Sequence, residues 1–371
     1  MKYYLIAGEA SGDLHGANLM KSILKEDPDA EFRFWGGDLM SAVGGTLVKH
    51  YKELAFMGFI EVLFNLSTIL KNIKTCKKDV TDFQPDALIF IDYPGFNLRI
   101  AKWAKEQGFK THYYISPQIW AWKEGRIKGI KKCIDAMYVI LPFEKSFYED
   151  KHKFPVHFVG HPLIDAIGQH KLMLPEAFKE KNGLDDRPII AILPGSRKQE
   201  IRKMLEVMLS IVDDFPKYQF IIAGAPSQDA SFYAPFIKKE GVHLVMNQTY
   251  DLLSHSNAAL VTSGTATLET ALFKIPEVVC YKGNAISYQI AKKVIKVDFI
   301  SLVNLIMGKE VVKELIQNDF NPERLKEELT HITDDYNRAV LFLDYYDLEK
   351  KLGGKGASDN TAQLIVKAIR T

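Results

Sequence analysis

The sequence predicts an α/β protein built from two doubly wound domains in series, each a parallel sheet with helices on both faces. Short apolar runs of four or five residues recur along the chain, and longer stretches with helical periodicity separate them. These runs are apolar at nearly every position, as strands buried on both faces of a parallel sheet are. The length of 371 residues suits two domains, at about 150 residues each.

The first domain is expected over residues 1–165. Its predicted strands lie at residues 3–7, 32–35, 87–91, 111–115, 136–140 and 156–159. A polar stretch at 170–182, predicted to be helical, follows the turn at 160–162 and separates the two strand series.

The second domain is expected over residues 166–345. Its predicted strands lie at residues 189–193, 219–223, 243–246, 258–262 and 278–281. Residues 322–351 have a helical pattern, which a glycine-rich segment at 353–356 ends. Asp359 is expected to cap a last helix within the tail, residues 346–371.

Composition and charge exclude several classes of protein. The 48 basic and 46 acidic residues leave a net charge of +2, so no nucleic-acid partner is expected. The three cysteines are far apart and lack metal-ligand spacing, and the histidines show none either, so we expect neither disulfides nor a metal site. No run of about 18 apolar residues predicts a membrane span. A reducing cytoplasm fits best.

Two loops of the first domain follow predicted strands at their carboxyl ends, where doubly wound sheets bind ligands. The loop at 8–16 brings Glu9, Ser11 and Gly12 to the start of a helix, whose amides can receive an anion or a sugar hydroxyl. Its glycine spacing fits neither a dinucleotide fingerprint nor a P-loop. Asp92 ends the strand at 87–91 and is a candidate general base. The alternative for the first loop is a plain strand-to-helix turn with an N-cap, and the alternative for Asp92 is that it caps the following helix.

Two segments combine apolar and basic side chains, as surfaces that contact anionic lipid do. One is an aromatic turn followed by a basic stretch, and its candidate contacts are Trp120, Trp122, Lys123, Arg126 and Lys128. The other is a phenylalanine-rich segment with the candidates Phe56, Met57, Phe59, Ile60, Leu63 and Phe64. The alternatives are a solvated helix face for the first and ordinary core for the second.

Two loops of the second domain suit a nucleoside diphosphate without a metal. Arg197 follows the strand at 189–193, and its guanidinium can grip phosphate oxygens, although a loop ion pair with Glu200 is the alternative. After the strand at 258–262, small residues open a helix whose amides and hydroxyls can form a phosphate cradle, and Glu269 can accept from ribose hydroxyls. A plain N-cap is the alternative for these small residues. The candidate contacts are Gly195, Ser196, Arg197, Glu200, Ser263, Gly264, Thr265, Ala266, Thr267 and Glu269.

Seven motifs together resemble those of the bacterial lipid-A-disaccharide synthases, in the same order. They are G-E-A-S-G-D-x-H-G at 8–16, I-D-Y-P-G-F-N at 91–97, S-P-Q-I-W-A-W at 116–122, L-P-F-E at 141–144, V-G-H-P at 159–162, P-G-S-R-x-x-E at 194–200 and S-G-T-A-T-L-E at 263–269.

The resemblance implies a GT-B fold, with two Rossmann-like domains facing a cleft and the C-terminal helix packing back on the N-terminal domain. It implies an inverting glycosyltransferase that needs neither metal nor cofactor, joining UDP-2,3-diacylglucosamine to 2,3-diacylglucosamine 1-phosphate (lipid X) and releasing UDP. The first domain would hold the lipid acceptor and the second the UDP-sugar. Asp92 matches an aspartate that the family needs, Arg197 an essential arginine and Asn304 an active-site asparagine.

The acylated substrates imply a cytoplasmic enzyme on the surface of the inner membrane, and a homodimer is compatible with the resemblance. Two other functions suit the same architecture. One is another UDP-N-acetylglucosamine enzyme, either the lipid-linked transferase of peptidoglycan synthesis or a 2-epimerase. An epimerase acts without any lipid, so a requirement for acylated substrate distinguishes the synthase from it. The other is a non-catalytic UDP-sugar-binding protein, which would have no use for a base such as Asp92.

Overall fold

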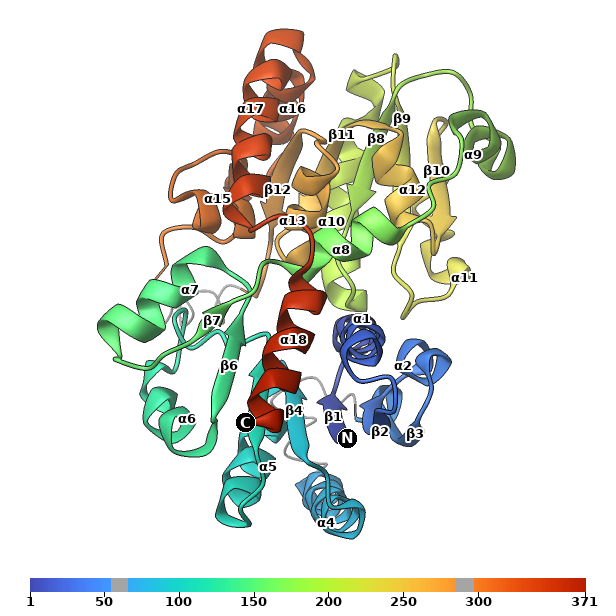
Figure 1. The fold of residues 1–371 in the computed structure, drawn as a ribbon. Helices are drawn as coiled ribbons and strands as arrows, with labels where there is room; N and C mark the ends of the chain where they lie inside the picture. Colours follow the sequence, from blue (N-terminus) through green and yellow to red (C-terminus); the bar gives the residue numbers. More distant parts are fainter. Residues whose placement is uncertain (55–65, 285–296) are drawn as a thin grey trace. The chain divides into compact units, whose positions relative to one another are not determined.

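The structure is a computed structural model that describes residues 1–54, 66–284 and 297–371. The chain forms two compact units (Figure 1), one of residues Met1–Ala166 and Leu352–Thr371, the other of residues Ile167–Lys351. Each unit is a parallel sheet with helices packed on it, so the predicted fold class is confirmed. None of the helices in the described ranges has the length and apolar character needed to span a bilayer.

The first unit contains a seven-stranded sheet in the order β3-β2-β1-β4-β5-β6-β7, and all its recorded strand pairs are parallel. Its elements are β1 (Lys2–Ala7), α1 (Ala10–Glu26), β2 (Glu31–Gly36), α2 (Asp38–Val43), β3 (Thr46–His50), η1 (Tyr51–Glu53), α4 (Leu66–Phe83), β4 (Ala87–Ile91), α5 (Pro94–Glu106), β5 (Thr111–Tyr114), η2 (Glu124–Arg126), α6 (Ile127–Cys133), β6 (Ala136–Val139), α7 (Pro142–Ser146), η3 (Phe147–Lys151), β7 (His157–Phe158), the start of α8 (Pro162–Gln169), and α18 (Ala357–Arg370).

The second unit contains a six-stranded sheet in the order β10-β9-β8-β11-β12-β13, again with parallel pairs. Its elements are the end of α8, then α9 (Pro175–Asn182), β8 (Ile189–Leu193), α10 (Lys198–Met208), η4 (Leu209–Asp214), β9 (Gln219–Gly224), α11 (Ala230–Tyr233), β10 (Val242–Met246), α12 (Thr249–Ser254), β11 (Ser256–Thr262), α13 (Thr265–Leu272), β12 (Glu277–Tyr281), α15 (Leu302–Met307), β13 (Lys313–Ile316), α16 (Pro322–Thr333) and α17 (Asp335–Lys351).

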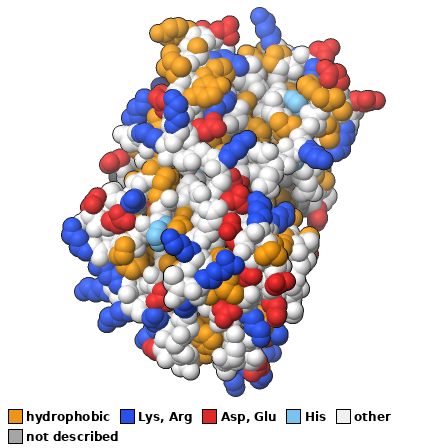
Figure 2. Space-filling view, viewed as in Figure 1, with side chains coloured by type: hydrophobic (Ala, Val, Ile, Leu, Met, Phe, Trp, Pro, Cys, Tyr) orange, Lys and Arg blue, Asp and Glu red, His pale blue; other side chains and the backbone are white. Residues whose placement is uncertain are grey.

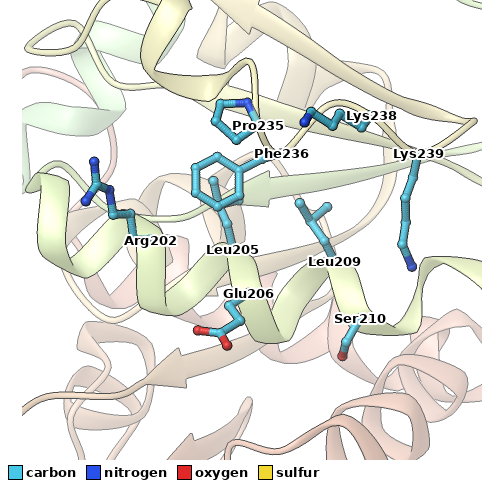
Figure 3. A pocket seen from close by; sticks show the side chains of 9 residues that line it. All are labelled: Arg202, Leu205, Glu206, Leu209, Ser210, Pro235, Phe236, Lys238 and Lys239. Carbon is cyan, nitrogen blue, oxygen red and sulfur yellow. The ribbon is translucent and has the colours of Figure 1, made fainter.

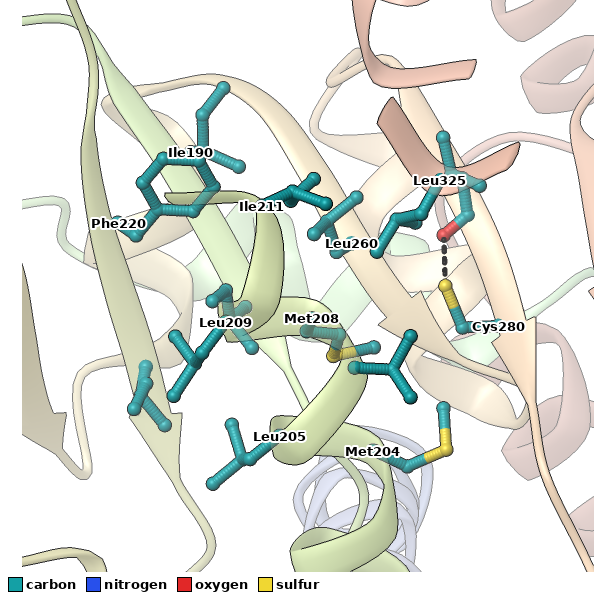
Figure 4. Close-up of a cluster of buried hydrophobic side chains, with 14 of the residues drawn as sticks. Ile190, Met204, Leu205, Met208, Leu209, Ile211, Phe220, Leu260, Cys280 and Leu325 are labelled. Carbon is teal, nitrogen blue, oxygen red and sulfur yellow. Dashed lines mark hydrogen bonds between the residues drawn. The ribbon is translucent and has the colours of Figure 1, made fainter. Parts of the chain in front are cut away.

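Both sheets are buried on their two faces, which explains why their central strands are mostly apolar. In the second unit, Met204, Leu205 and Met208 of α10 belong to one buried cluster with Ile190 of β8 and Leu260 of β11 (Figure 4). A separate apolar cluster covers the other face of that sheet. Burial of these side chains supplies the main driving force for folding each unit.

The predicted strands coincide with observed ones, whereas two strands at sheet edges were not anticipated. These are β3 (Thr46–His50) and β13 (Lys313–Ile316), which both include polar residues and carry half-exposed or exposed positions. An edge strand is covered on fewer sides, so its sequence lacks the continuous apolar run that identifies a central strand.

Two predicted helices have limits that differ from the observed ones. The helix expected at 170–182 begins only at Pro175, because proline occupies the first helical turn and disfavours helix in the residue before it. The helical stretch at 322–351 is two helices, separated at Asp334, whose extended backbone ends α16 and whose carboxylate accepts from the Asn337 N–H at 3.2 Å.

The predicted cap at Asp359 is also wrong, but the predicted packing of the last helix is confirmed. Gly356 is the N-cap of α18, and its N–H donates to the Asp165 carboxylate at 2.7 Å. Asp359 instead pairs with Lys25 of α1 at 2.8 Å. Buried side chains of α18 join the core of the first unit beside α1 (Figure 1), namely Ala362, Ile365 and Val366.

Candidate functional site

The strand order of each sheet reverses at one point, and the predicted site residues follow the two strands at that point. In the first unit the reversal lies between β1 and β4, which precede the Glu9 and Asp92 loops. In the second unit it lies between β8 and β11, which precede the Arg197 and Ser263 loops. Ligands of doubly wound sheets bind at such points, outside the carboxyl ends of the strands.

Asp92 has a fixed and strained backbone. Its φ of +43° and the φ of +49° at Tyr93 place two successive side-chain-bearing residues in the left-handed region. The Asp92 N–H donates to the Tyr114 carbonyl at 3.1 Å. The Asp92 carbonyl accepts from the Tyr113 hydroxyl at 2.6 Å and from the Asn97 amide at 2.7 Å. Because the main chain makes these bonds, the carboxyl group is left for other partners.

The electrostatic environment of Asp92 suits a base. Burial, and then the negative charge of Glu9, raise its pKa to about 6, against a smaller lowering by the Tyr93 N–H. Glu9 itself is exposed at the N-cap of α1, and its side chain makes no capping bond. A carboxyl group with this pKa is largely ionised at neutral pH and is more basic than an ordinary aspartate.

The rest of the first loop divides between exposed and structural residues. Ser11 is exposed in the first turn of α1, while Gly12 is buried and a β-carbon there would stand 3.1 Å from the Ala7 β-carbon. Asp13 is buried, and its carboxylate accepts from the N–H groups of Gly37, Leu39 and Met40 at 2.7 to 3.1 Å. Asp13 therefore caps α2 and belongs to the scaffold.

Two buried histidines lie near this loop. Burial lowers the pKa of His15 to about 4, and burial together with the charge of His15 lowers the pKa of His161 to about 3. The Nδ1 atom of His161 accepts from the Leu163 N–H at 3.2 Å. Both imidazoles are therefore neutral at physiological pH.

Glu144 organises the aromatic turn of the first unit, a role that sequence reasoning missed. Its carboxylate is 1% exposed and accepts from the Ser116 hydroxyl at 2.6 Å and the Trp120 indole N–H at 3.1 Å. It also accepts from the N–H groups of Ile140 and Leu141 at 3.2 and 3.0 Å. The L-P-F-E motif at 141–144 contained the signal, since a Glu in the first turn of a helix commonly bonds back to the N-cap.

The two tryptophans of this turn consequently differ. Trp120 is half-buried and packs edge-on against Phe143. Trp122 is 45% exposed, with the Lys123 ammonium 4.1 Å and the Arg126 guanidinium 5.9 Å from its ring centroid. Lys128 is exposed on α6. The predicted lipid contacts Phe56, Met57, Phe59, Ile60, Leu63 and Phe64 lie outside the described residues.

In the second unit, the loop after β8 is closed by Glu200. Gly195 has a φ of +96°, and a β-carbon there would lie 2.4 Å from the Glu200 carboxylate. That carboxylate accepts from the Ser196 N–H at 3.4 Å, and the Ser196 carbonyl accepts from the Ser227 hydroxyl at 3.0 Å. Arg197 is the N-cap residue of α10. The loop thus brings an arginine to a helix N-terminus beside a compact turn.

The loop after β11 presents an open helix N-terminus. Gly264 is the N-cap of α13 and has no side chain to cap it, and a β-carbon there would meet nothing within 4 Å. Gly264 and Thr265 are exposed and Ala266 is half-buried, whereas Thr267 is buried with its hydroxyl donating to the Gly264 carbonyl at 2.8 Å. The first-turn N–H groups of α13 are thereby suited to an anion.

Glu269 lies one turn further along α13. The Tyr250 hydroxyl donates to its carboxylate at 3.1 Å, and burial raises the pKa of Glu269 above its ordinary value. Tyr250 is held in turn by the His170 ring, which packs edge-on against it at 5.3 Å. Neither Tyr250 nor His170 carried a signal in the sequence, because each is distant from Glu269 along the chain.

Asn304 is completely engaged by its own chain. Its side chain is fully buried, and its amide donates to the Val312 carbonyl at 2.8 Å and to Glu314 at 2.9 Å. Its amide oxygen accepts from the N–H groups of Val311 and Val312 at 2.7 and 3.0 Å. These four bonds use the whole capacity of an asparagine side chain.

A separate pocket of about 490 Å³ lies along α10 and η4 (Figure 3). Its floor is apolar and its rim carries cations, one of which, Lys239, pairs with Asp213 at 2.8 Å. The lining residues are Arg202, Leu205, Glu206, Leu209, Ser210, Pro235, Phe236, Lys238 and Lys239. None of them was singled out in the sequence. In the described part of the chain, no group of three or more His, Cys, Asp or Glu side chains is placed to hold a metal ion.

Comparison with known proteins identifies a family along almost the whole chain. A family model described as lipid-A-disaccharide synthetase matches residues 3–368. The lipid-A-disaccharide synthase of Geobacter metallireducens is 40% identical over 377 residues, covering 98% of this chain and 96% of that protein. That of Coxiella burnetii is 38% identical over 370 residues, covering 98% of each.

Solved structures with the same architecture are more distant in sequence. The UDP-GlcNAc 2-epimerase of Neisseria meningitidis, bound to UDP-GlcNAc, superposes with a TM-score of 0.67 at 15% identity, with full coverage of both chains. The glycotransferase of kitacinnamycin gives a TM-score of 0.67 at 12% identity, covering 99% of this chain and 98% of that one. At these low sequence identities the superpositions show a shared fold and do not indicate the reaction.

Proposed function

This chain belongs to the lipid-A-disaccharide synthase family, and from that membership we propose that it transfers 2,3-diacylglucosamine from UDP to the 6-hydroxyl of 2,3-diacylglucosamine 1-phosphate. The match over residues 3–368 carries the proposal. The products are a β-1,6-linked disaccharide 1-phosphate and UDP. One bond forms, between the acceptor oxygen and the anomeric carbon, as the bond to the UDP oxygen breaks on the opposite face.

In this reaction Asp92 takes the proton of the acceptor hydroxyl. Its pKa of about 6 supports that role, because the carboxylate is ionised at the pH of the cell and still basic enough to accept a proton in the transition state. The negative charge of Glu9 helps to raise the pKa of Asp92, and Ser11 and Gly12 belong to the same loop as Glu9. The first unit is thus the acceptor-binding domain.

The second unit binds the UDP-sugar and stabilises the leaving diphosphate. Arg197 supplies positive charge, and the Gly195–Ser196 turn brings it to the carboxyl end of β8. Thr265 and the first-turn amides of α13 donate to phosphate oxygens, and Glu269 accepts from ribose hydroxyls. Ser263 holds the start of this turn, because its hydroxyl and its N–H donate to the Ile300 and Cys280 carbonyls. Because the Asn304 amide has no remaining bonding capacity, we assign it a positioning role.

The enzyme works at the cytoplasmic surface of the inner membrane, since both substrates carry acyl chains. The exposed Trp122 with Lys123, Arg126 and Lys128 suits contact with an anionic lipid surface. The phenylalanine-rich segment, residues 56–64, is proposed to contact acyl chains as well. No membrane span is required for this mode of attachment.

We also propose that the enzyme forms a homodimer through α17. Hydrophobic side chains gather over the α16–α17 end of the second unit (Figure 2), and four large ones on α17 are 46% to 76% exposed: Tyr336, Val340, Leu343 and Tyr346. Their spacing places them on one helix face. Leu343→Glu should give monomers by sedimentation, and unchanged dimer would place the contact elsewhere.

The decisive experiment measures UDP release from UDP-2,3-diacylglucosamine, with and without the acceptor, followed by mass analysis of the lipid product. Release that depends on the acceptor and yields a disaccharide 1-phosphate is expected. Inactivity on the acylated donor, with turnover of plain UDP-N-acetylglucosamine, would instead favour a 2-epimerase, whose solved examples share this fold. UDP binding without any turnover would favour a non-catalytic binding protein.

A further inference from the structure

The phosphate-binding turn that begins at Ser263 is tied to a second loop of the same unit. The Ser263 hydroxyl donates to the Ile300 carbonyl at 2.8 Å, and its N–H donates to the Cys280 carbonyl at 3.1 Å. The first bond crosses from the start of α13 to the residues that precede α15. The position of the Ser263 oxygen therefore depends on where the backbone of Ile300 lies.

A single carboxylate on β13 holds that second loop. Glu314 accepts from the N–H of Ile300 and from the N–H of Ser301, both at 2.9 Å. The same carboxylate accepts from the Asn304 amide at 2.9 Å. These three donors use both oxygens of the Glu314 carboxylate as acceptors, which a side chain with a single acceptor oxygen could not provide. Hydrogen bonds to a carboxylate are also stronger than those between two neutral groups.

Asn304 closes the other side of the same loop. Its amide oxygen accepts from the N–H groups of Val311 and Val312, and Ser301 caps α15 by accepting from the Asn304 N–H at 3.2 Å. The stretch from residue 300 to the start of β13 is thus held by two side chains, Asn304 and Glu314. Through this network Asn304 is joined to Glu314, which also holds Ile300.

A second buried acid on the next strand provides a natural contrast. Glu277 of β12 is fully buried, and neither of its carboxylate oxygens has a hydrogen-bond partner among the described residues. Burial, and then the charge of Glu314, raise the pKa of Glu277 well above its ordinary value. Glu277 thus lies buried beside Glu314 and makes no side-chain hydrogen bond to the loop.

We propose that Glu314 is a positioning residue for UDP-sugar binding. It fixes Ile300, and through Ile300 the Ser263 hydroxyl and the turn at the N-terminus of α13, without touching the substrate itself. The inference rests on the proposed function, because it assigns the α13 turn to the diphosphate. It adds to that function a residue on β13 that no motif of the sequence marked.

The test compares Glu314→Gln with Glu277→Gln. In Glu314→Gln, an NH₂ group replaces one of the two carboxylate oxygens and cannot accept a hydrogen bond from the Ile300 or Ser301 N–H. The loop therefore loses at least one of these bonds. We expect the KM for UDP-2,3-diacylglucosamine to rise roughly tenfold, with kcat changed by less than about threefold and the KM for the acceptor unchanged. Glu277→Gln replaces a buried carboxyl group that bonds no part of the loop by a near-isostere and should leave all three parameters at the wild-type values.

A double-mutant cycle with Ser263→Ala tests the route. If Glu314 acts through Ile300 and Ser263, the double variant should bind the donor about as weakly as Glu314→Gln alone, since both changes break one chain of contacts. Strictly additive effects would overturn the route. An equal rise in KM for Glu277→Gln would overturn the positioning role by showing a general response of the sheet. Glu314→Asp, which keeps the charge and shortens the reach, should give an intermediate KM and replaces Glu314→Gln if that variant does not fold.

UDP calorimetry distinguishes failure of this inference from failure of the proposed function. Wild-type protein that binds no UDP would reject the diphosphate site and the function together. Wild-type protein that binds UDP, alongside a Glu314→Gln variant that binds it equally well, would reject only the positioning role. Weaker UDP binding by Glu314→Gln, with a cooperative melting transition retained, is the expected result.

Discussion

The ring of Tyr93 lies over Gly8, so close that a β-carbon added to Gly8 would stand 2.4 Å from the ring. This contact joins the loop after β1 to the loop after β4, and thereby joins Glu9 to Asp92. The backbone of Tyr93 is in the left-handed region. Its ring also stacks on the ring of Phe96, with 5.8 Å between the ring centroids. The geometry of the proposed base therefore depends on the absence of a side chain at residue 8.

Gly8→Ala should displace Tyr93 and lower activity. Overpacking of this kind costs about 1 to 3 kcal/mol, so we expect a lower melting temperature and a fall in kcat as Asp92 shifts with Tyr93. Gly95→Ala is the matched control, because a β-carbon at Gly95 meets nothing within 4 Å and its φ is ordinary for a side-chain-bearing residue. Equal activity of the two variants would mean that the Gly8 contact does not set the site.

Asp92→Asn should remove turnover and retain UDP binding. The main chain of Asp92 bonds to Tyr114, Tyr113 and Asn97, and an amide of the same size keeps these bonds while losing the ability to take a proton. Loss of a general base lowers kcat by about 100-fold to 10,000-fold. Steady-state rates measure the loss of turnover, and calorimetry with UDP on the same preparation measures the retained binding. Near-normal turnover would rule out Asp92 as the base.

The activity should fall at acidic pH with an apparent pKa of about 6. The pKa of Asp92 is raised, so its active ionised form is lost as the pH falls through about 6, rather than near pH 4 as for an ordinary aspartate. Below that pH, log(kcat/KM) should decline with unit slope. Glu9→Gln removes the negative charge that raises this pKa, so the acidic limb should move to lower pH. A limb that stays in place or moves upward would contradict the assignment.

Glu144→Gln should loosen the aromatic turn. Glutamine cannot accept at both ends of its side chain, so at least one of the donors that bond to Glu144 is left buried without a partner. The cost is about 1 to 3 kcal/mol, measured as a lower free energy of unfolding in urea. Ser146→Ala, which removes one exposed hydroxyl bond at the end of the same helix, serves as control and should change stability far less.

Trp122→Ala should weaken binding to vesicles that contain anionic lipid, because the residue exposes a large ring beside the cations of Lys123 and Arg126. The control is Leu174→Ala, which removes a side chain that is 71% exposed in the second unit. Co-sedimentation with phosphatidylglycerol vesicles, at low and high salt, measures the effect. Identical binding by wild-type protein and the Trp122 variant would restrict membrane contact to other residues.

The sequence by itself determined the fold class, the central strands and the loops that carry the chemistry. A strand buried on both faces needs apolar residues at every position, and the residues that follow it lie at the carboxyl edge of a parallel sheet. Asp92, Arg197 and Ser263 could be placed at that edge from local pattern alone. The motifs around them were also sufficient to indicate the family, which the match over residues 3–368 confirms.

Only the tertiary structure decided what many of these side chains do. It showed that Asp13 caps α2, that Glu144 holds Trp120 while Trp122 is exposed, and that Glu314 and Asn304 bind one loop. Burial and hydrogen bonding join residues distant in the chain, as Tyr250 joins Glu269 and Asp165 joins the start of α18. The pKa of Asp92 depends likewise on its burial and on Glu9, far away in sequence, so no local pattern contains it.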